Sequence, residues 1–365
     1  MLYRHYGKTG KKVSILGFGG MRFKNVRDTG ECVAMMLDAA EAGVNYFDTA
    51  PGYMGTKSEQ VFGEAFKEFK KRGIPFYSAT KTFKADESSI RRELDAQLRR
   101  LHVDCIDFYH VWCLTTLEDW EGRKQSGVID AFLKLKEEGL IGHICVSSHL
   151  IGDQIKGLLL EGVFEGVLFG YSAYNFNIRE AAFDAIRKHR LGCVVMNPLG
   201  GGIVPQNPKV FDFIRTRENE TVVEGALRFI FSHEEINTAL VGFGTREEVA
   251  QAVKAVQGYR RISPEEMTRM RDHIKESFRG LCTGCRYCDE CPEGIPIPKF
   301  MDAYNHKLLY GKEQELLDRL RWHWDISPRI AERCTECELC EKLCTQHLPI
   351  MSRLKEIATT GKRKE

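Results

Sequence analysis

Short apolar runs alternate eight times with longer amphipathic segments in the first 258 residues of this chain, and this alternation constrains the fold most strongly. Each apolar run is typical of a buried strand, and each intervening segment of about 10–15 residues is typical of a helix. Eight strand–helix units in about 250 residues predict an α/β fold, a closed (β/α)8 TIM barrel of parallel strands. The predicted strands are 15–18, 45–48, 76–80, 105–110, 144–147, 166–169, 193–196 and 238–242.

A doubly wound open sheet is the alternative arrangement for such an alternation. It would usually carry the phosphate loop G-x-G-x-x-G after its first strand, followed by an acidic residue at the end of the next strand. Residues 16–22 read Leu-Gly-Phe-Gly-Gly-Met-Arg, which is rich in glycine but has a different spacing. We therefore expect residues 1–258 to form the barrel, with a β-hairpin at the N-terminus.

The C-terminal part of the chain is set apart by its cysteines, because eight of the 13 lie between positions 282 and 344. Cysteines three positions apart wrap a short loop around one [4Fe–4S] cluster, and in two-cluster ferredoxins the fourth ligand comes from the other run. This logic predicts two [4Fe–4S] clusters with crossed ligation. One is held by Cys282, Cys285, Cys288 and Cys344, and the other by Cys334, Cys337, Cys340 and Cys291.

Other uses of these cysteines explain the spacing less well. Zinc usually takes two ligand pairs that are separated by a longer loop, and disulfides require an oxidising compartment. Two features depart from the ferredoxin pattern without removing a ligand. The first run has two residues rather than three before Cys291, and Thr345 stands where proline is usual. We expect residues 259–365 to form a mainly helical, ferredoxin-like dicluster domain.

Charge and hydropathy narrow the range of partners. The chain has 53 Lys and Arg against 51 Asp and Glu, a net charge of +2 that does not suggest binding to nucleic acid or to an acidic membrane surface. An uninterrupted apolar run of about 18 residues, as a transmembrane helix requires, does not occur in the sequence. The first residues also lack the apolar core of a signal peptide. We therefore expect a cytoplasmic protein without a nucleic-acid or membrane partner.

Polar side chains stand at the carboxyl ends of three successive predicted strands, where a barrel places its chemistry. Asp48 ends one strand and is followed by Tyr53, while Lys81 and His110 end the next two strands. A lysine beside a tyrosine favours proton release from the phenol, and a carboxylate keeps that lysine charged and oriented. Such a tyrosine can exchange a proton with a carbonyl or alcohol oxygen. The site would reduce a carbonyl once a hydride source is bound.

These residues resemble the catalytic tetrad of the aldo-keto reductase family. Residues 3–10, 13–22, 139–149, 174–175 and 197–202 also resemble motifs of that family. The C-terminal cysteine runs are similar to the ferredoxin-like extension of its bacterial and archaeal iron–sulfur branch. The resemblance implies that Tyr53 is the general acid, that Lys81 tunes it, that Asp48 supports Lys81 and that His110 orients a small aldehyde, ketone or alcohol substrate.

The resemblance also implies a nicotinamide cofactor, NADP or NAD, at the barrel mouth. Several positions depart from the family pattern: Ser147 and Ser148 replace a Ser-Asn pair, Tyr171 replaces a glutamine, and Met196 replaces the stacking aromatic residue. Gly244 takes the place of a basic residue for the 2′-phosphate, for which Arg246 is the nearest substitute. The implied cofactor-binding residues are Ser147, Ser148, Asn175, Asn197, Leu199, Gly200, Gly244, Thr245 and Arg246.

Two other functions remain open from the sequence. A nicotinamide moves two electrons together, whereas an iron–sulfur cluster moves one. Coupling the two normally calls for a flavin, and FMN would fit a phosphate site at the mouth of a barrel. The protein would then be a flavin and iron–sulfur relay that serves a redox partner protein. The second alternative is a non-catalytic redox sensor or scaffold, against which the complete tetrad argues.

Overall fold

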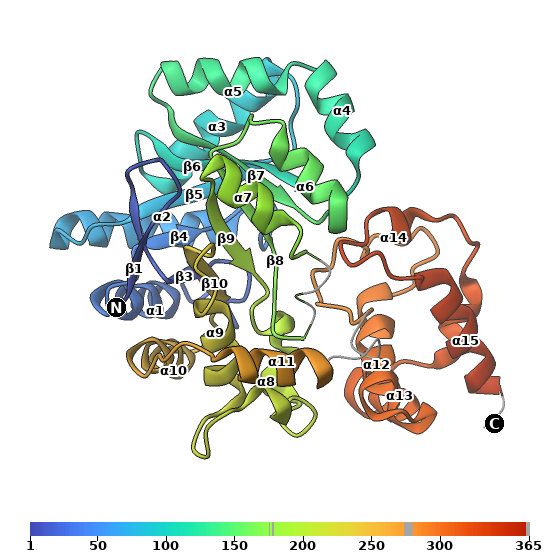
Figure 1. The fold of residues 1–365 in the computed structure, drawn as a ribbon. Helices are drawn as coiled ribbons and strands as arrows, with labels where there is room; N and C mark the ends of the chain where they lie inside the picture. The colour runs from blue at the N-terminus through green and yellow to red at the C-terminus, as the bar shows by residue number, and fades with distance from the viewer. Residues whose placement is uncertain (175, 177–178, 274–279, 363–365) are drawn as a thin grey trace. The chain divides into compact units, whose positions relative to one another are not determined.

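The computed structural model describes residues 1–174, 176, 179–273 and 280–362 (Figure 1). It divides into two compact units. The barrel unit consists of Met1–Leu199 and Ile214–Glu266, and the C-terminal unit consists of Gly200–Phe213 and Met267–Glu365. The division of the chain into domains 1–258 and 259–365 stays a prediction. The compact units differ from it because residues 200–213 group with the C-terminal residues. Within the described ranges, no helix is long and apolar enough to cross a membrane.

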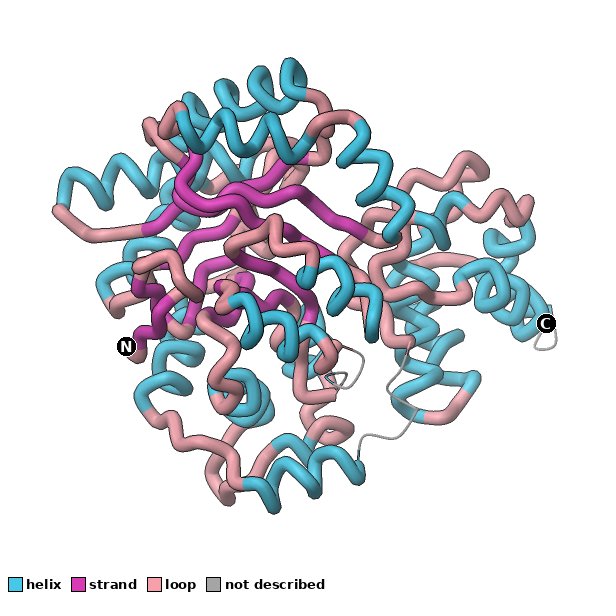
Figure 2. The backbone as a smooth tube through the Cα atoms, turned by 45° about the horizontal axis from the view of Figure 1, so that its top comes forward, coloured by secondary structure: helices cyan, strands magenta, loops and turns pink. Residues whose placement is uncertain are grey.

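The barrel unit contains a closed barrel of parallel strands, as the alternation predicts. Helices surround the strands (Figure 2). The strands follow the order β10-β3-β4-β5-β6-β7-β8-β9 around the barrel. Their bounds are β3 Leu16–Gly19, β4 Tyr46–Asp48, β5 Tyr77–Thr82, β6 Ile106–Leu114, β7 Ile141–Ser148, β8 Gly166–Gly170, β9 Gly192–Met196 and β10 Thr238–Gly242.

The helices of the barrel unit alternate with the strands, as the sequence pattern predicts. Their bounds are α1 Thr29–Glu41, α2 Lys57–Arg72, α3 Glu87–Leu101, α4 Leu117–Gln125, α5 Val128–Glu137, α6 Gly152–Leu160, α7 Ala182–His189, α9 Val222–Phe231 and α10 Arg246–Gln257. Helix α4 was not expected, because its sequence is strongly polar and has only a weak apolar face. Helix α11 is described over Pro264–His273, and Ser263 caps it by accepting a hydrogen bond from the Glu266 amide at 3.2 Å.

The hairpin at the N-terminus leads a tyrosine into the barrel. Strands β1, Tyr3–His5, and β2, Lys12–Ser14, are antiparallel, and the fully buried Tyr6 follows β1. The ring of Tyr6 packs against Phe108 with centroids 4.3 Å apart. A Cβ atom on Gly166 or Gly192, at the amino ends of β8 and β9, would lie within 2.1 Å of Tyr6. Only glycine at these two positions therefore leaves room for the Tyr6 ring. The ring lies at the amino ends of the strands, so the carboxyl ends remain for the site.

The C-terminal unit is helical and has its own apolar core. Phe300 and Met301 on one helix and Ile350 and Leu354 on another are fully buried, and several cysteines pack against this core. The helices are α8 Ile203–Gln206, α12 Ile297–Tyr310, α13 Glu313–Asp318, a π-helix Arg319–Trp324, a 3-10 helix Pro328–Arg333, α14 Leu339–Lys342 and α15 Ile350–Lys362. This agrees with the predicted mainly helical domain.

Candidate active site and iron–sulfur centres

A buried ion pair forms the base of the predicted tetrad. Asp48 ends β4, and Lys81 lies on the neighbouring strand β5, so the two side chains meet at the same end of the barrel. The ammonium group of Lys81 donates to both carboxylate oxygens of Asp48 at 2.7 Å, and both residues are at most 2% exposed. Burial raises the pKa of Asp48, whereas the positive charge of Lys81 acts in the opposite direction. Asp48 thus fixes the position of the lysine.

Tyr53 lies above this pair in the turn that follows β4. The Lys81 nitrogen is 5.6 Å from the centroid of the Tyr53 ring, which is partly buried. The edge of Trp112 meets the same ring with centroids 5.8 Å apart, and Phe83 stacks on Trp112 at 4.0 Å. The tyrosine is therefore held between a cation and an aromatic stack. Trp112 serves this packing role.

His110 joins the pair from β6, directly beside Lys81 in the register of the strands. Its Nδ1 atom lies 3.2 Å from the Thr80 carbonyl oxygen, which can only accept, so Nδ1 carries the proton. Burial, and after it the charge of Lys81, lowers the pKa of His110 to about 3. The ring is therefore neutral near neutral pH. Its buried Nε2 atom has no hydrogen-bond partner among the described residues and presents a lone pair to a ligand hydroxyl.

The pH dependence of catalysis tests the neutral state of His110. A depressed pKa means that His110 does not gain a proton as the pH falls through 6.5, the ordinary value for histidine. We expect a profile of kcat/KM without a limb near pH 6.5, measured between about pH 5.5 and 8. The His110→Asn variant should be slower but have the same profile shape. A limb near 6.5 that disappears in His110→Asn would contradict this expectation.

The structure describes most of the residues that the resemblance implies for nicotinamide binding. Ser147 and Ser148 end β7 and are buried, and the Ser148 hydroxyl accepts from the Leu150 amide at 3.2 Å. Asn197 follows β9 with a φ of 57°, in the left-handed region that asparagine tolerates better than most residues. Asn175 lies outside the described residues. Leu199 is partly buried, and Gly200 also has a left-handed φ, of 65°.

The loop after β10 is engaged by neighbouring side chains. The Gly244 amide donates to Glu248 at 2.7 Å, and the Thr245 hydroxyl caps α10 by accepting from the Glu248 amide. Arg246 forms a two-pronged ion pair with Asp38 on α1, at 2.5 and 2.7 Å. Its side chain is 51% exposed. The guanidinium of Arg246, the nearest substitute for the basic residue that Gly244 replaces, is therefore already paired with Asp38.

Tyr171, at the position of the family's glutamine, is directed toward the helices around the barrel. Its hydroxyl lies 3.1 Å from Nε2 of His233, and its ring stacks on Phe229 of α9 at 5.9 Å. Tyr171 therefore packs β8 against α9 and does not replace the amide of a glutamine. The fully buried Trp120 is likewise structural, since its indole nitrogen donates to Glu161 at 3.0 Å.

The cysteines assigned to the first cluster come together in the C-terminal unit. Sγ of Cys285 lies 3.4 Å from the hydroxyl of Thr345, the neighbour of Cys344. Burial raises the pKa of Cys282 to about 12, and nearby Cys285 and Cys344 add to the effect. Burial, Cys285, Cys282 and Cys344 likewise raise the pKa of Cys288. Residues of the two runs therefore lie close together here, and the crossed ligation stays a prediction. Thr345, in the usual place of proline, supplies a hydroxyl to this set.

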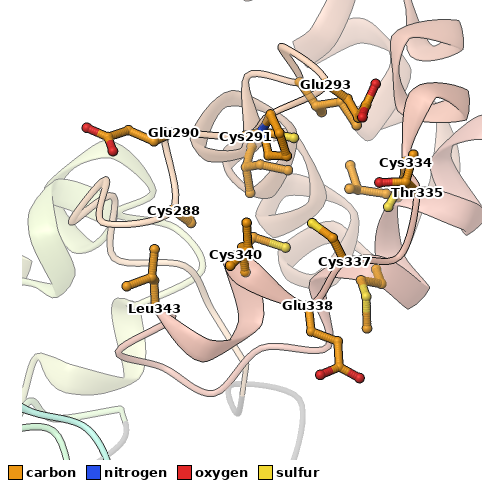
Figure 3. A pocket seen from close by; sticks show the side chains of 16 residues that line it. Cys288, Glu290, Cys291, Glu293, Cys334, Thr335, Cys337, Glu338, Cys340 and Leu343 are labelled. Carbon is orange, nitrogen blue, oxygen red and sulfur yellow. The ribbon is translucent and has the colours of Figure 1, made fainter.

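The cysteines assigned to the second cluster line one pocket. Figure 3 shows the thiols of Cys337 and Cys340 directed into this space, whereas the carboxylates of Glu290, Glu293 and Glu338 point away from it. Cys337 is exposed, in contrast to the buried Cys288 and Cys344 of the other set. The pocket lining includes four assigned ligands, Cys291, Cys334, Cys337 and Cys340.

Both sets fit a cluster better than a single metal ion. Among the residues that the structure describes, no three His, Cys, Asp or Glu side chains converge closely enough to hold one ion. A four-iron cube binds its thiolates at separate corners, which requires a wider spacing. All eight thiols are free of disulfide bonds. Negative thiolates are costly to bury alone, and iron would supply the compensating positive charge.

Comparison with known proteins decides the family. The model of the aldo/keto reductase family matches residues 15–275, well over half of the chain. The chain belongs to this family. A second model, that of a 4Fe-4S dicluster domain, matches residues 281–349 of this aldo/keto reductase. It is thus an oxidoreductase that combines the family's barrel with an iron–sulfur domain.

Relatives of this aldo/keto reductase match about three quarters of it. L-galactose dehydrogenase of Arabidopsis thaliana is 26% identical over 295 residues, which are 73% of this chain and 91% of the relative. An aldo-keto reductase from Bacillus halodurans in its holo form is 26% identical, with a TM-score of 0.66, and the match covers 75% of this chain and 97% of that one. The apo form of the same enzyme gives a TM-score of 0.61. Nearly the whole of that enzyme is matched, so the remaining quarter of this chain has no counterpart in it.

Proposed function

We propose that this aldo/keto reductase reduces an aldehyde or ketone to an alcohol with NADPH or NADH, or catalyses the reverse reaction. The observation that supports this most directly is the arrangement of Lys81 and Asp48 beneath the ring of Tyr53. A tyrosine whose ring lies near a fixed, buried ammonium group suits a proton donor. His110 adds a second polar atom, Nε2, which has no hydrogen-bond partner among the residues described.

The proposed reaction assigns one task to each side chain. When bound, the nicotinamide supplies a hydride to the carbonyl carbon. Tyr53 transfers its phenolic proton to the carbonyl oxygen, and Lys81 stabilises the phenolate that remains. The new alcohol hydroxyl can donate to Nε2 of His110, which holds the oxygen in place. In the reverse direction, Tyr53 takes the proton back while the hydride leaves the carbon.

Turnover by anaerobically purified protein tests this proposal. Oxidation of NADPH or NADH should depend on an added aldehyde or ketone and yield one alcohol per nicotinamide. With a nicotinamide deuterated at C4, the deuterium should appear on the carbinol carbon of the product. Sugars with an aldehyde or lactol group belong in the panel, because a relative is named for the dehydrogenation of L-galactose. Lack of carbonyl-dependent oxidation across the panel would contradict the reductase function.

The choice between NADPH and NADH should be weak. Arg246 is exposed and paired with Asp38, so its help to a 2′-phosphate is limited. We expect Arg246→Ala to change the NADPH to NADH ratio of kcat/KM by about fivefold or less, as for other exposed ion pairs. Asp38→Asn, which releases the guanidinium, should raise the ratio. A preference for NADPH above about a thousandfold that survives Arg246→Ala would place the phosphate site elsewhere.

An electron relay is the second candidate function. The exposure of Cys337 favours it, because electron exchange with a partner protein requires a cluster near the surface. A flavin would convert the two electrons of a nicotinamide into single electrons for the clusters. Denaturation of the purified protein should then release FMN, and NAD(P)H should reduce the clusters as fast as the enzyme turns over. Absence of flavin, together with clusters that stay oxidised during turnover, would exclude the relay.

A further inference from the structure

The C-terminal unit contains a buried arginine, Arg353, that pairs with no carboxylate among the described residues. Arg353 on α15 is 7% exposed, and its Nη1 atom has no hydrogen-bond partner in the part of the chain that the structure describes. Its guanidinium lies 4.6 Å from the centroid of the Tyr304 ring on α12. An aromatic face attracts a cation but does not neutralise it. A buried charge without a counter-charge destabilises the folded state.

The nearest acidic candidate on the same helix is already in use. Glu356 accepts a hydrogen bond from the Tyr304 hydroxyl at 2.5 Å and forms an ion pair with Lys307. Arg353 is therefore stacked on a tyrosine whose hydroxyl holds that carboxylate in place. The positive charge of Arg353 must be balanced by another group.

The cysteines of the first cluster site lie within electrostatic reach of Arg353, and they become negative when they bind iron as thiolates. The guanidinium interacts first with Tyr304 and then with Cys282 and Cys344. Space for it exists beside the first run because residue 280 is a glycine: a Cβ atom there would lie 2.7 Å from Nη2 of Arg353. Asn305, next to Tyr304, holds the backbone of Cys282 with two hydrogen bonds of 2.8 Å. These contacts fix the position of Arg353 relative to the loop that carries Cys282.

We propose that Arg353 is the internal counter-ion of the cluster held by Cys282, Cys285, Cys288 and Cys344, and that it raises the reduction potential of this cluster. The inference rests on the proposed binding of two clusters. Reduction adds one electron, and so one negative charge, to a cluster that four thiolates already make anionic. A fixed positive charge nearby stabilises the reduced form more than the oxidised form.

The second cluster site has no cation in its lining. Three glutamates belong to this lining, Glu290, Glu293 and Glu338, but their carboxylates point away from the pocket, and Glu338 is paired with Lys342 at 3.2 Å. Its cluster should therefore have the lower potential. An electron that enters at the exposed second cluster would then move to the buried first cluster, because the first has the higher affinity for electrons.

A redox titration monitored by EPR, on the full-length anaerobic protein, tests the counter-ion. Arg353→Gln removes the charge and should lower the midpoint potential of the first cluster by at least about 59 mV. For a one-electron couple this is a tenfold change in the equilibrium constant. The second cluster should not shift. Arg353→Lys keeps the charge and should retain most of the wild-type potential. Lys355→Gln is the matched control, since Lys355 is an exposed cation on the same helix.

Each outcome bears on the proposal. If Arg353→Gln assembles both clusters and the first keeps its potential, or if Lys355→Gln shifts it equally, the proposal is wrong. If Arg353→Gln loses the first cluster and Arg353→Lys restores it, the counter-ion role is supported. Loss of that cluster in both variants would assign Arg353 a packing role instead. Wild-type protein with about four irons would contradict the proposed two clusters rather than the role of Arg353.

Discussion

Replacement of Tyr53 by phenylalanine is expected to lower kcat by about 10²–10⁴-fold, because it removes the proposed proton donor. The change leaves the ring in contact with Trp112 and does not touch the ion pair between Lys81 and Asp48. Thermal unfolding of the barrel should therefore be nearly unchanged. The measurement is the steady-state rate with the best carbonyl substrate, together with a melting curve of each protein.

The matched control for this variant is Tyr77→Phe. Tyr77 begins β5 at the amino end of the strand, so the same chemical change is made at the far end of the barrel from Lys81. This control should keep the wild-type rate. Lys81→Met is a poorer test, since it leaves the buried Asp48 without its partner and costs about 3–5 kcal/mol of stability. A Tyr53→Phe enzyme with the wild-type rate would remove Tyr53 from the mechanism.

Loss of single cysteines should damage the cluster of the opposite run. Wild-type protein purified without oxygen should contain about eight irons per chain, from two four-iron clusters. Cys344→Ser should impair the first cluster, whose other ligands are Cys282, Cys285 and Cys288, and spare the second. Cys291→Ser should do the reverse. The physical reason is that residues of the two runs lie close together where Thr345 contacts Cys285. Iron analysis and EPR of both variants measure this.

Cys105→Ser provides the control for these variants, because Cys105 belongs to the barrel unit and precedes β6. It should keep the full iron content and both EPR signals. Damage in which each variant loses the cluster of its own run would contradict crossed ligation. Severe loss of iron is expected to unfold the C-terminal unit before the barrel, since the cysteine loops border a small apolar core.

The strands could be predicted closely because each is a short apolar run with turn residues beside it. Residues 238–242 were expected as a strand and form β10 with the same bounds. Helix α4 was missed because Glu118, Asp119 and their neighbours give too weak an apolar stripe. The structure instead holds this helix through Arg123, which bonds the backbone of Trp112 at 2.8 Å. A tertiary contact of this kind produces no periodic pattern of apolar residues in the sequence.

The tetrad could be predicted because a barrel brings the carboxyl ends of neighbouring strands together, so the position along the chain fixes the position in space. Contacts between loops do not follow this rule. Arg246 and Asp38 pair across 208 residues, and no pattern in the sequence indicates that this pairing occupies Arg246. Arg353 is similar, because a helix pattern indicates a buried face but not which cation on it lacks a partner. The roles of the nucleotide-binding residues stay predictions.

The grouping of Gly200–Phe213 with the C-terminal residues has a consequence for biosynthesis. Within that unit the Tyr310 hydroxyl donates to Asn207 at 2.9 Å, although Asn207 is translated more than a hundred residues earlier. Residues 200–213 therefore leave the ribosome before the residues that they contact in this unit are translated. In a chain that ends after Glu266, residues 200–213 would lack these partners. Iron insertion should accordingly be a late, post-translational step, and shortened chains should be targets for proteolysis at this segment.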